Sequence, residues 1–377
     1  MIITVFIYIL LLFINMLCVF KKKNNKLVLV LTFFFLIILM GGNIKNPDYE
    51  NYYSYYYYGY YPSSMEKGYI GLSMIFSKIG VPYIAFTTIL MFMAGGIVIW
   101  VGQKVSANLH LITLFYMLFQ IYYDYVQIRC TIAIALFILA LYFNAEKRKK
   151  SFLIAMIFST LFHKMMIVYF ALFIVGKKYK FFEILLSFVF ATELLFCIII
   201  FWNGNQLPFL SFFSSVLPID IGKFEKYFTT STSLSFVLSF FLQFSNMFLT
   251  FFLKKTIISN ADNYSKEKKQ RIIRFAEMIW ISVLLTSYAL PLSMLHEEFT
   301  RCIRVGNILV YFLAGILLYL AQDVKGKFYI AIPNKYKINM WVYVGLIILN
   351  AIVWYIFYTP YNINVDLFMY NGILPWY

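Results

Sequence analysis

The chain of 377 residues is 62% hydrophobic and 21% aromatic, and only 13% of its residues are charged. A soluble domain carries about a quarter charged residues, so this composition excludes a soluble fold. Apolar runs of roughly twenty residues recur along the whole chain, and each is long enough to cross a hydrocarbon core of about 30 Å. Helices satisfy their own backbone hydrogen bonds in lipid. The sequence therefore predicts an all-α transmembrane bundle of about 10–11 spans.

The basic residues are unevenly placed along the chain. The formal net charge is +16, and 23 of the 32 Lys and Arg residues lie in short segments between apolar runs. These segments are residues 21–26, 104, 147–150, 177–180, 254–274 and 325–337. Basic short loops mark the cytoplasmic side of a membrane protein, where they face anionic lipid. The charge therefore predicts a multi-pass protein of the cell membrane and does not indicate a nucleic-acid partner.

Placing the basic segments inside gives a topology for the N-terminal half. Ile2–Phe20 lacks a basic n-region and a small-residue cleavage site, so we expect a retained helix that runs inward. Residues 27–40 return outward, and residues 41–68 form an external loop. The run at 69–79 is too short to span, so we expect an interfacial or re-entrant helix. The next crossings are expected at residues 82–101, 109–126 and 127–143.

Residues 151–175 are ambiguous, because basic residues flank both ends of this apolar run. The run is too short for two full helical crossings, so we expect a discontinuous helix whose halves meet near His163. A single long crossing is the alternative and would invert everything downstream. Under the first interpretation the remaining crossings are residues 181–201, 234–253, 275–295, 305–321 and 338–358. Residues 202–233 are then an external loop, residues 254–274 a basic cytoplasmic loop, and residues 359–377 an external tail. Residues 1–377 are expected to form one membrane domain.

The expected external loop carries nine tyrosines within residues 49–61. One interpretation is an aromatic belt at headgroup depth. The other is a sugar-binding surface, because flat rings with hydroxyl tips suit the faces and edges of carbohydrates. Asp48 and Glu50 could bind a divalent cation, but this motif alone is a weak signal, and the four isolated cysteines show no ligand spacing. Glu66 is adjacent to Lys67, so it could be a catalytic acid or half of a surface ion pair.

Charged residues inside apolar runs are candidates for a functional site, because burying a charge in lipid is costly. Arg129 lies three residues inside a predicted span, where it could snorkel to headgroups or face a wet cavity and bind a pyrophosphate. His163 and Lys164 interrupt another apolar run. One interpretation is that His163 is a buried histidine whose hydrogen bonds are satisfied within the core. The other is that the two residues form a binding site at a helix break.

A late pair of arginines, Arg301 and Arg304, is spaced three residues apart and so shares one helical face. An ion pair between Glu297 and Arg301 is one interpretation of this segment. The other is a clamp for a lipid phosphate, because arginine binds phosphate oxygens in bidentate fashion.

Taken together, these motifs resemble those of the EpsG-type members of the Wzy polysaccharide polymerases, membrane proteins of bacterial exopolysaccharide and capsule synthesis. The resemblance covers roughly residues 27–320. The matching motifs are Asp48-x-x-x-Tyr52 with Glu66-x-Gly68-Tyr69, Gln127-Ile-Arg129-x-x-Ile-Ala133, Leu161-Phe162-His163 with Lys164, and more loosely Arg301 with Arg304. Cys130 departs from the pattern, because a polar residue often follows the arginine in such segments.

The resemblance implies glycosyl transfer at the outer face of the bacterial plasma membrane. A growing glycan on undecaprenyl pyrophosphate would be transferred to the free sugar end of the next lipid-linked repeat unit. The implied substrate-binding residues are Arg129, Arg301, Arg304, Lys164, Gln127, Tyr52 and Tyr53. The implied base or orienting group is His163 first, then Asp48 and Glu66. No metal or other cofactor is required if the arginines neutralise the leaving pyrophosphate.

Other functions are compatible with the same features. A flippase for lipid-linked oligosaccharides should show two related halves, and the sequence shows no convincing repeat. A ligase or another lipid-sugar glycosyltransferase would share the external arginines, and a metal-dependent one would need Asp48 and Glu50. A scaffold without activity would leave Arg129 and His163 dispensable. A polymerase would work beside a flippase and a chain-length regulator of the same pathway.

Overall fold

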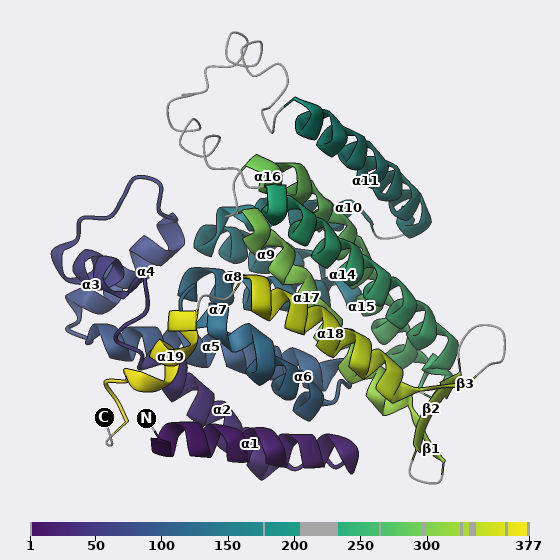
Figure 1. Cartoon of the computed structure of the whole chain (residues 1–377), viewed down its shortest axis with the longest axis horizontal. Coiled ribbons are helices and arrows are strands. Elements are labelled where there is room, and N and C mark those ends of the chain that lie inside the picture. Colours follow the sequence, from purple (N-terminus) through teal and green to yellow (C-terminus); the bar gives the residue numbers. More distant parts are fainter. Residues whose placement is uncertain are drawn as a thin grey trace.

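The protein is a helical bundle that is sized to span a membrane. The computed structural model describes residues 2–175, 178–203, 233–263, 265–295, 299–324, 327–331, 337–358 and 361–374. Within these residues, six helices are long and apolar enough to cross a bilayer, and three shorter apolar helices accompany them. The helices pack side by side, with α3, α4 and both chain ends at one end of the bundle and the strands at the other (Figure 1). This architecture confirms the predicted polytopic helical fold.

The first helices follow the predicted apolar runs. They are α1 (Ile2–Phe20), α2 (Lys26–Gly41) and α5 (Tyr83–Lys104). The segment expected as an external loop is partly helical, because it contains α3 (Tyr49–Tyr58), and the short run after it is α4 (Lys67–Lys78). The 12 residues of α4 are about 18 Å long, which is too short to cross the hydrocarbon core.

The predicted crossing at 109–126 is an irregular helix. α6 (Leu109–Phe115) passes into a π-helical turn, η1 (Tyr116–Gln120), and then into α7 (Ile121–Asp124). π-Helical turns inside α-helices are rare, and those that occur are often found at functional sites. α8 (Ile128–Ala145) follows after a sharp turn and is nearly enclosed by its neighbours.

The ambiguous segment is a helical hairpin with a break at its tip. α9 (Lys149–Phe162) ends at His163, whose backbone is extended, and η2 (Lys164–Ala171) and α10 (Leu172–Val175) return. Lys149 Nζ donates a hydrogen bond to the Phe173 carbonyl at 2.5 Å, so both ends of the hairpin lie at the same end of the bundle. The predicted discontinuous helix is therefore confirmed. The returning leg covers the distance because a 3₁₀ helix rises about 2 Å per residue, against about 1.5 Å for an α-helix.

The second half of the bundle contains the most enclosed helix. Its elements are α11 (Tyr179–Trp202), α14 (Ser233–Asn260), η4 (Ala261–Asn263), α15 (Lys266–Leu285), η5 (Thr286–Tyr288), α16 (Ala289–Leu295) and α17 (Thr300–Leu320). The basic segment 254–274, expected as a loop, is mostly the end of α14 and the start of α15. Residues 204–232 of the other expected loop, and Glu297, lie outside the described residues.

A small sheet and two helices complete the chain. The antiparallel strands are β1 (Gln322–Val324), β2 (Lys327–Ala331) and β3 (Lys337–Asn339), which the sequence did not predict. They lead into α18 (Met340–Tyr358) and α19 (Tyr361–Met369). The chain then returns to the end of α2, where Asn371 Nδ2 donates hydrogen bonds to the carbonyls of Ile38 and Leu39.

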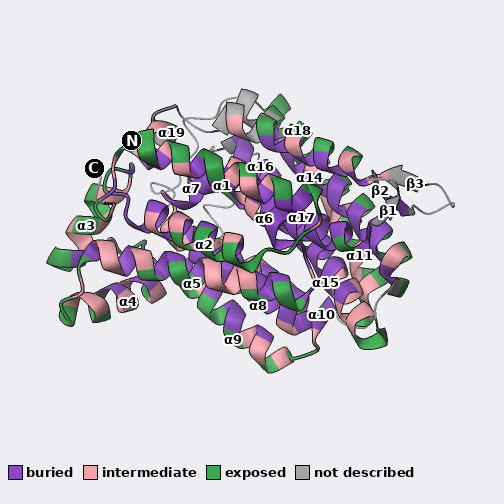
Figure 2. Ribbon diagram, turned by 90° about the horizontal axis from the view of Figure 1, so that it is seen from below, coloured by how far each residue is buried: buried purple, intermediate pink, exposed green. Residues whose placement is uncertain are grey.

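The hydrophobic core lies along α8 and α17, in the middle of the bundle. The apolar window of α17 is 94% buried, whereas those of α1 and α11 are 28% and 11% buried. Figure 2 shows this contrast, with buried residues along α17 and many exposed ones along the outer helices. The exposed residues of α1 and α11 are mainly Phe, Ile and Leu. Such an apolar outer surface is expected where helices face lipid.

Candidate active site

A cavity of about 750 Å³ opens at the end of the bundle that carries α3 and α4. Its wall comes from five parts of the chain: α3 with the segment after it, the start of α8, the tip of the α9–η2 hairpin, the end of η5, and the start of α17. The polar residues that line it are Asp48, Asn51, Tyr52, Tyr55, Ser64, Glu66, Arg129, His163, Lys164, Tyr288 and Arg301. Seven of the ten residues selected from the sequence therefore share one cavity.

An ion pair between Arg129 and Glu66 lies in the wall of this cavity. Arg129 is in the first turn of α8, and its Nη1 donates a hydrogen bond to Glu66 Oε2. Glu66 is only 8% exposed, and the Arg129 guanidinium also lies over the Tyr52 ring, 5.2 Å from its centroid. Arginine is suited to both contacts, because its planar guanidinium pairs with carboxylates and stacks on aromatic rings. Arg129 therefore faces a polar cavity instead of snorkelling alone to the headgroups.

The break in the α9–η2 hairpin brings Lys164 to the same carboxylate and places His163, next to it in the chain, in the cavity wall. The Lys164 N–H donates to Glu66 Oε1 at 3.4 Å, and Lys164 Nζ donates to the Ser64 carbonyl at 2.7 Å. The Met165 N–H donates to His163 Nδ1 at 3.4 Å. A neutral imidazole that accepts at Nδ1 carries its proton at Nε2. In this arrangement His163 is a donor at Nε2.

Gly68 allows this close approach of α4 to the hairpin. A Cβ atom at Gly68 would lie 2.6 Å from the Leu161 carbonyl oxygen, which is closer than real Cβ contacts. Glycine at this position therefore lets the start of α4 rest against the last turn of α9. This contact explains why the glycine two residues after Glu66 belongs to the site.

The two faces of α3 have different neighbours. Asp48, Asn51, Tyr52 and Tyr55, at helical spacing, line the cavity. Tyr49 and Tyr53 stack on each other on the other face, 5.7 Å apart, and both contact Tyr83 of α5. Tyr53 is therefore not brought to the cavity, although the sequence had grouped it with Tyr52. Burial raises the pKa of Tyr52 to about 12, so its hydroxyl stays protonated and can donate a hydrogen bond.

The two late arginines take different positions. Arg301 lines the cavity. Arg304 is one helical turn deeper and 1% exposed, with its Nη2 3.5 Å from Asp124 Oδ1. None of its three guanidinium nitrogens has a hydrogen-bond partner among the described residues. Gln127, just before α8, does not line the cavity either.

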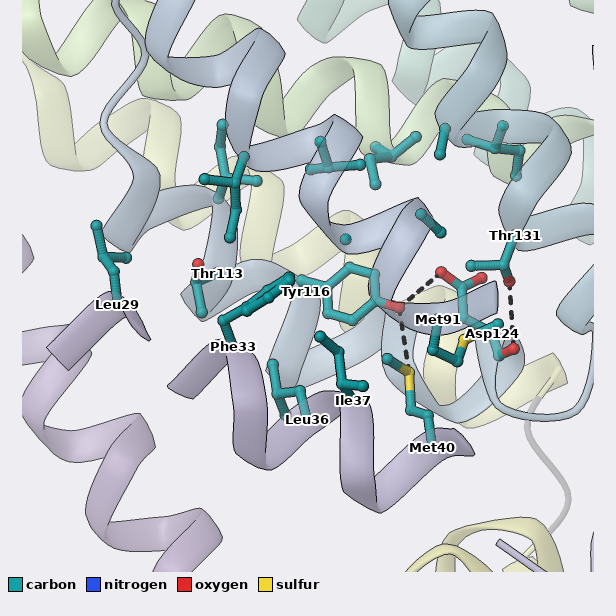
Figure 3. Close-up of a pocket in the computed structure, with 18 residues that line it drawn as sticks. Leu29, Phe33, Leu36, Ile37, Met40, Met91, Thr113, Tyr116, Asp124 and Thr131 are labelled. Carbon is teal, nitrogen blue, oxygen red and sulfur yellow. Dashed lines mark hydrogen bonds between the residues drawn. The ribbon is translucent and has the colours of Figure 1, made fainter. Parts of the chain in front are cut away.

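Asp124 is the polar residue that the sequence did not single out. It accepts hydrogen bonds from Tyr116 Oη at 2.9 Å and Gln120 Nε2 at 3.1 Å, and it is the partner of Arg304. Figure 3 shows the Tyr116 hydroxyl pointing to the Asp124 carboxylate at one end of an apolar pocket. Both donors belong to the π-helical turn η1. An acidic residue inside a predicted span was the available signal, since such residues are costly unless paired.

The cavity combines cationic groups with carboxylates and a wall of polar and aromatic side chains. Arg129, Lys164 and Arg301 could neutralise a phosphate group, and Tyr52 and Asn51 could hydrogen-bond a sugar. Within the described residues, no group of three or more His, Cys, Asp and Glu side chains is placed to hold a metal ion. Glu50, the second half of the possible cation motif, does not line the cavity.

Comparison with known proteins gives the chain a family. The family model described as the EpsG family matches residues 26–371, which is nearly the whole chain. No curated protein and no solved structure matches the chain. The match includes every element that contributes to the cavity, from α3 to α17. The chain therefore belongs to the EpsG family of Wzy-type polysaccharide polymerases and is a multi-pass membrane protein with a polymerase-type role in polysaccharide synthesis.

Proposed function

We propose that this protein extends a polysaccharide by transferring a growing glycan from undecaprenyl pyrophosphate to the next lipid-linked repeat unit at the outer face of the membrane. The main support is the cavity in which Arg129, Glu66, His163, Lys164 and Arg301 meet, at the opposite end of the bundle from the basic segments. By the distribution of basic residues, that end faces outward. Membership of the EpsG family supports the polymerase role. The lipid-linked donor, the side of the membrane and the roles of the individual residues are parts of our proposal.

The cationic side of the cavity binds the pyrophosphate of the donor. Arg129 and Arg301 face the leaving group, and Lys164 assists them from the hairpin tip. Negative charge grows on the pyrophosphate as its bond to the sugar breaks, so fixed cations stabilise the transition state more than the ground state. No metal is needed in this scheme, since the cations are supplied by side chains.

The carboxylate of Glu66 accepts the proton of the attacking hydroxyl. In the structure this carboxylate is held by Arg129 and by the Lys164 N–H. When the donor pyrophosphate takes over Arg129, one oxygen of Glu66 becomes available beside the reacting atoms. His163, with its proton on Nε2, orients the reactants, because its Nδ1 is already engaged by Met165. The resemblance had put His163 first as base, and the hydrogen-bond arrangement favours Glu66.

The reaction in this scheme is one balanced displacement. The hydroxyl oxygen of the acceptor sugar forms a bond to the anomeric carbon of the donor glycan. The bond from that carbon to the pyrophosphate oxygen breaks, and undecaprenyl pyrophosphate leaves. The proton of the hydroxyl moves to Glu66. The α3 face with Asp48, Asn51, Tyr52 and Tyr55 holds the acceptor sugar, because hydroxyl, amide and carboxylate groups beside flat rings suit a carbohydrate.

The test uses the purified protein in liposomes with lipid-linked repeat units. Wild type should lengthen the glycan and release undecaprenyl pyrophosphate, and Glu66→Gln should reduce the rate by ~10²–10⁴-fold, as for loss of a positioned proton acceptor. His163→Gln should have a smaller effect. Activity that survives chelation would support a metal-independent reaction, and loss of activity that Mg²⁺ restores would contradict it.

Cells that lack the protein distinguish the alternatives. A missing polymerase leaves single lipid-linked units on the outer face. Units trapped on the cytoplasmic face would indicate a flippase, and polymer that is made but not attached would indicate a ligase. Unchanged long polymer, in cells with no second polymerase, would refute the proposed function.

A further inference from the structure

A second polar cavity lies at the other end of the bundle, far along α2 from the candidate active site. Its volume is about 330 Å³, and it lies between the start of α2, the turn from α5 to α6, the start of α15 and the end of α17. Its polar lining residues are Asn24, Lys26, Gln103, Ser106, Lys268 and Tyr319. With two lysines and no acidic residue in its wall, this basic-end pocket is suited to an anion.

An apolar groove continues directly from the basic-end pocket. The groove, of about 350 Å³, shares Lys26, Leu29, Gln103 and Leu109 with the pocket, and α2 and α5 form its sides. The rest of its wall is apolar: Val30, Phe33, Phe34, Phe92, Gly96 and Ile99. Because Val30, Phe34 and Phe92 are each close to half exposed on the outer surface of the bundle, the groove is open along its side.

The groove runs on into a narrower slot between α2 and α5. Leu29, Phe33 and Ile99 line both. Figure 3 shows Leu29, Phe33, Leu36, Ile37 and Met40 following one another along α2 on one side of this slot. The distance from Lys26 to Ile37 along the helix is about 16 Å, close to the ~15 Å depth of one leaflet of the hydrocarbon core. A polar group at the pocket would thus have space beside it for a chain of one leaflet's length.

A buried polar network fixes the geometry of the pocket. The Asn25 N–H donates to His110 Nε2 at 3.1 Å, and His110 Nδ1 lies 2.8 Å from Asn15 Oδ1. Asn15 Nδ2 in turn donates to Thr32 Oγ1 at 2.9 Å. Lys22 Nζ donates to the Ala321 carbonyl at 2.5 Å, which ties the same turn to the end of α17. Contacts within the chain therefore hold the turn between α1 and α2, which directly precedes Lys26.

We propose that the basic-end pocket and its groove bind an anionic glycerophospholipid, with the phosphate between Lys26 and Lys268 and one acyl chain between α2 and α5. The positive charge of the pocket, the apolar lining of the groove and their shared wall match a molecule with an anionic head and an aliphatic chain. Basic pockets between membrane helices recognise anionic lipid headgroups by the same charge complementarity. The site does not depend on the polymerase reaction, since it lies at the opposite end of α2.

The first experiment measures lipid binding to the detergent-purified full chain by native mass spectrometry and by thermal shift. The probes are phosphatidylglycerol, phosphatidylcholine, glycerol 1-phosphate and a polyprenyl phosphate. Phosphatidylglycerol should bind and raise the melting temperature, and glycerol phosphate alone should not. In the Lys26→Gln/Lys268→Gln variant the affinity for phosphatidylglycerol should fall roughly 30-fold. Lys104→Gln is the matched control, because Lys104 is at the same end, beside Gln103, and does not line the pocket.

A second variant tests the groove without changing charge. A Cβ at Gly96 meets nothing within 4 Å, so Gly96→Leu can fold while its side chain fills the groove, and binding should weaken. Gly345→Leu on α18, where a Cβ also meets nothing, should leave binding unchanged. Equal binding of phosphatidylcholine, a preference for the polyprenyl phosphate, or full binding in the double lysine variant would each overturn the proposal.

Discussion

Arg304 and Asp124 face each other in the core of the bundle at 3.5 Å, with side chains only 1% and 4% exposed. Arg304 enters from α17 and Asp124 from the end of α7, next to the π-helical turn. The pair lies beneath the cavity, because Arg301 on the preceding turn of α17 lines it. A buried pair of this kind is costly to break, since removing one partner leaves an uncompensated charge.

We therefore expect Asp124→Ala to destabilise the protein strongly, by about 3–5 kcal/mol. Arg304→Met with Asp124→Asn should be more stable than Asp124→Ala alone, because neither charge then remains buried without its partner. Thermal unfolding in detergent measures both variants. If Asp124→Ala unfolds at the wild-type temperature, Arg304 has another acceptor and the pair is not needed for stability.

We expect that a lysine cannot replace Arg129 in polymer synthesis. Arg129→Lys keeps the charge but loses the planar fork that pairs with Glu66 and stacks on Tyr52. We expect polymer synthesis to fall by about 10²-fold, comparable to the loss of one positioned donor, at normal protein levels in the membrane. Arg148→Lys, at the basic end of α8, is the control and should keep full activity. Wild-type rates for Arg129→Lys would show that only charge is required.

A methyl group at Gly68 should disturb the site although it adds no polar atom. The Cβ of Gly68→Ala would meet the Leu161 carbonyl at 2.6 Å, so the start of α4 must move away from α9 and take Glu66 with it. We expect a large loss of activity with a modest loss of thermal stability. Gly71→Ala on the same helix is the matched control, because a Cβ there meets nothing within 4 Å. If the two variants are equally active, the contact of α4 with the hairpin does not position Glu66.

The hairpin fixes the sidedness of the second half of the chain. Lys150, in the first turn of α9, and Lys180, in the first turn of α11, are both exposed at the basic end, so cysteines at these positions should label from the same side of the membrane. A cysteine at Tyr60 should label from the outside and one at Asp262 from the cytoplasm. The native cysteines are all buried, so background labelling is low. Labelling of Lys150→Cys and Lys180→Cys from opposite sides would mean a single crossing and an inverted topology.

The sequence by itself predicted most of the membrane helices and most of the selected residues that line the cavity. Apolar runs long enough for the bilayer specify helices locally, so α1, α2, α5, α8 and α11 begin and end close to the expected residues. Polar residues inside apolar runs, which lipid would penalise, marked Arg129 and His163, and the spacing of the late arginines marked Arg301. All three line one cavity. The break at His163 followed from the length of the run and its basic flanks.

Only the tertiary structure decided which of these residues meet. Glu66 and Arg129 are 63 residues apart, and their pairing depends on Gly68 letting α4 rest on α9, a contact between separate helices that no local pattern encodes. Tyr53 and Tyr52 are adjacent in sequence, yet the helical rotation of α3 turns one toward α5 and the other toward the cavity. Only the structure identifies Asp124 as the partner of Arg304. The π-helical turn that places its hydrogen-bond donors, Tyr116 and Gln120, arises from packing and leaves no periodic signal in the sequence.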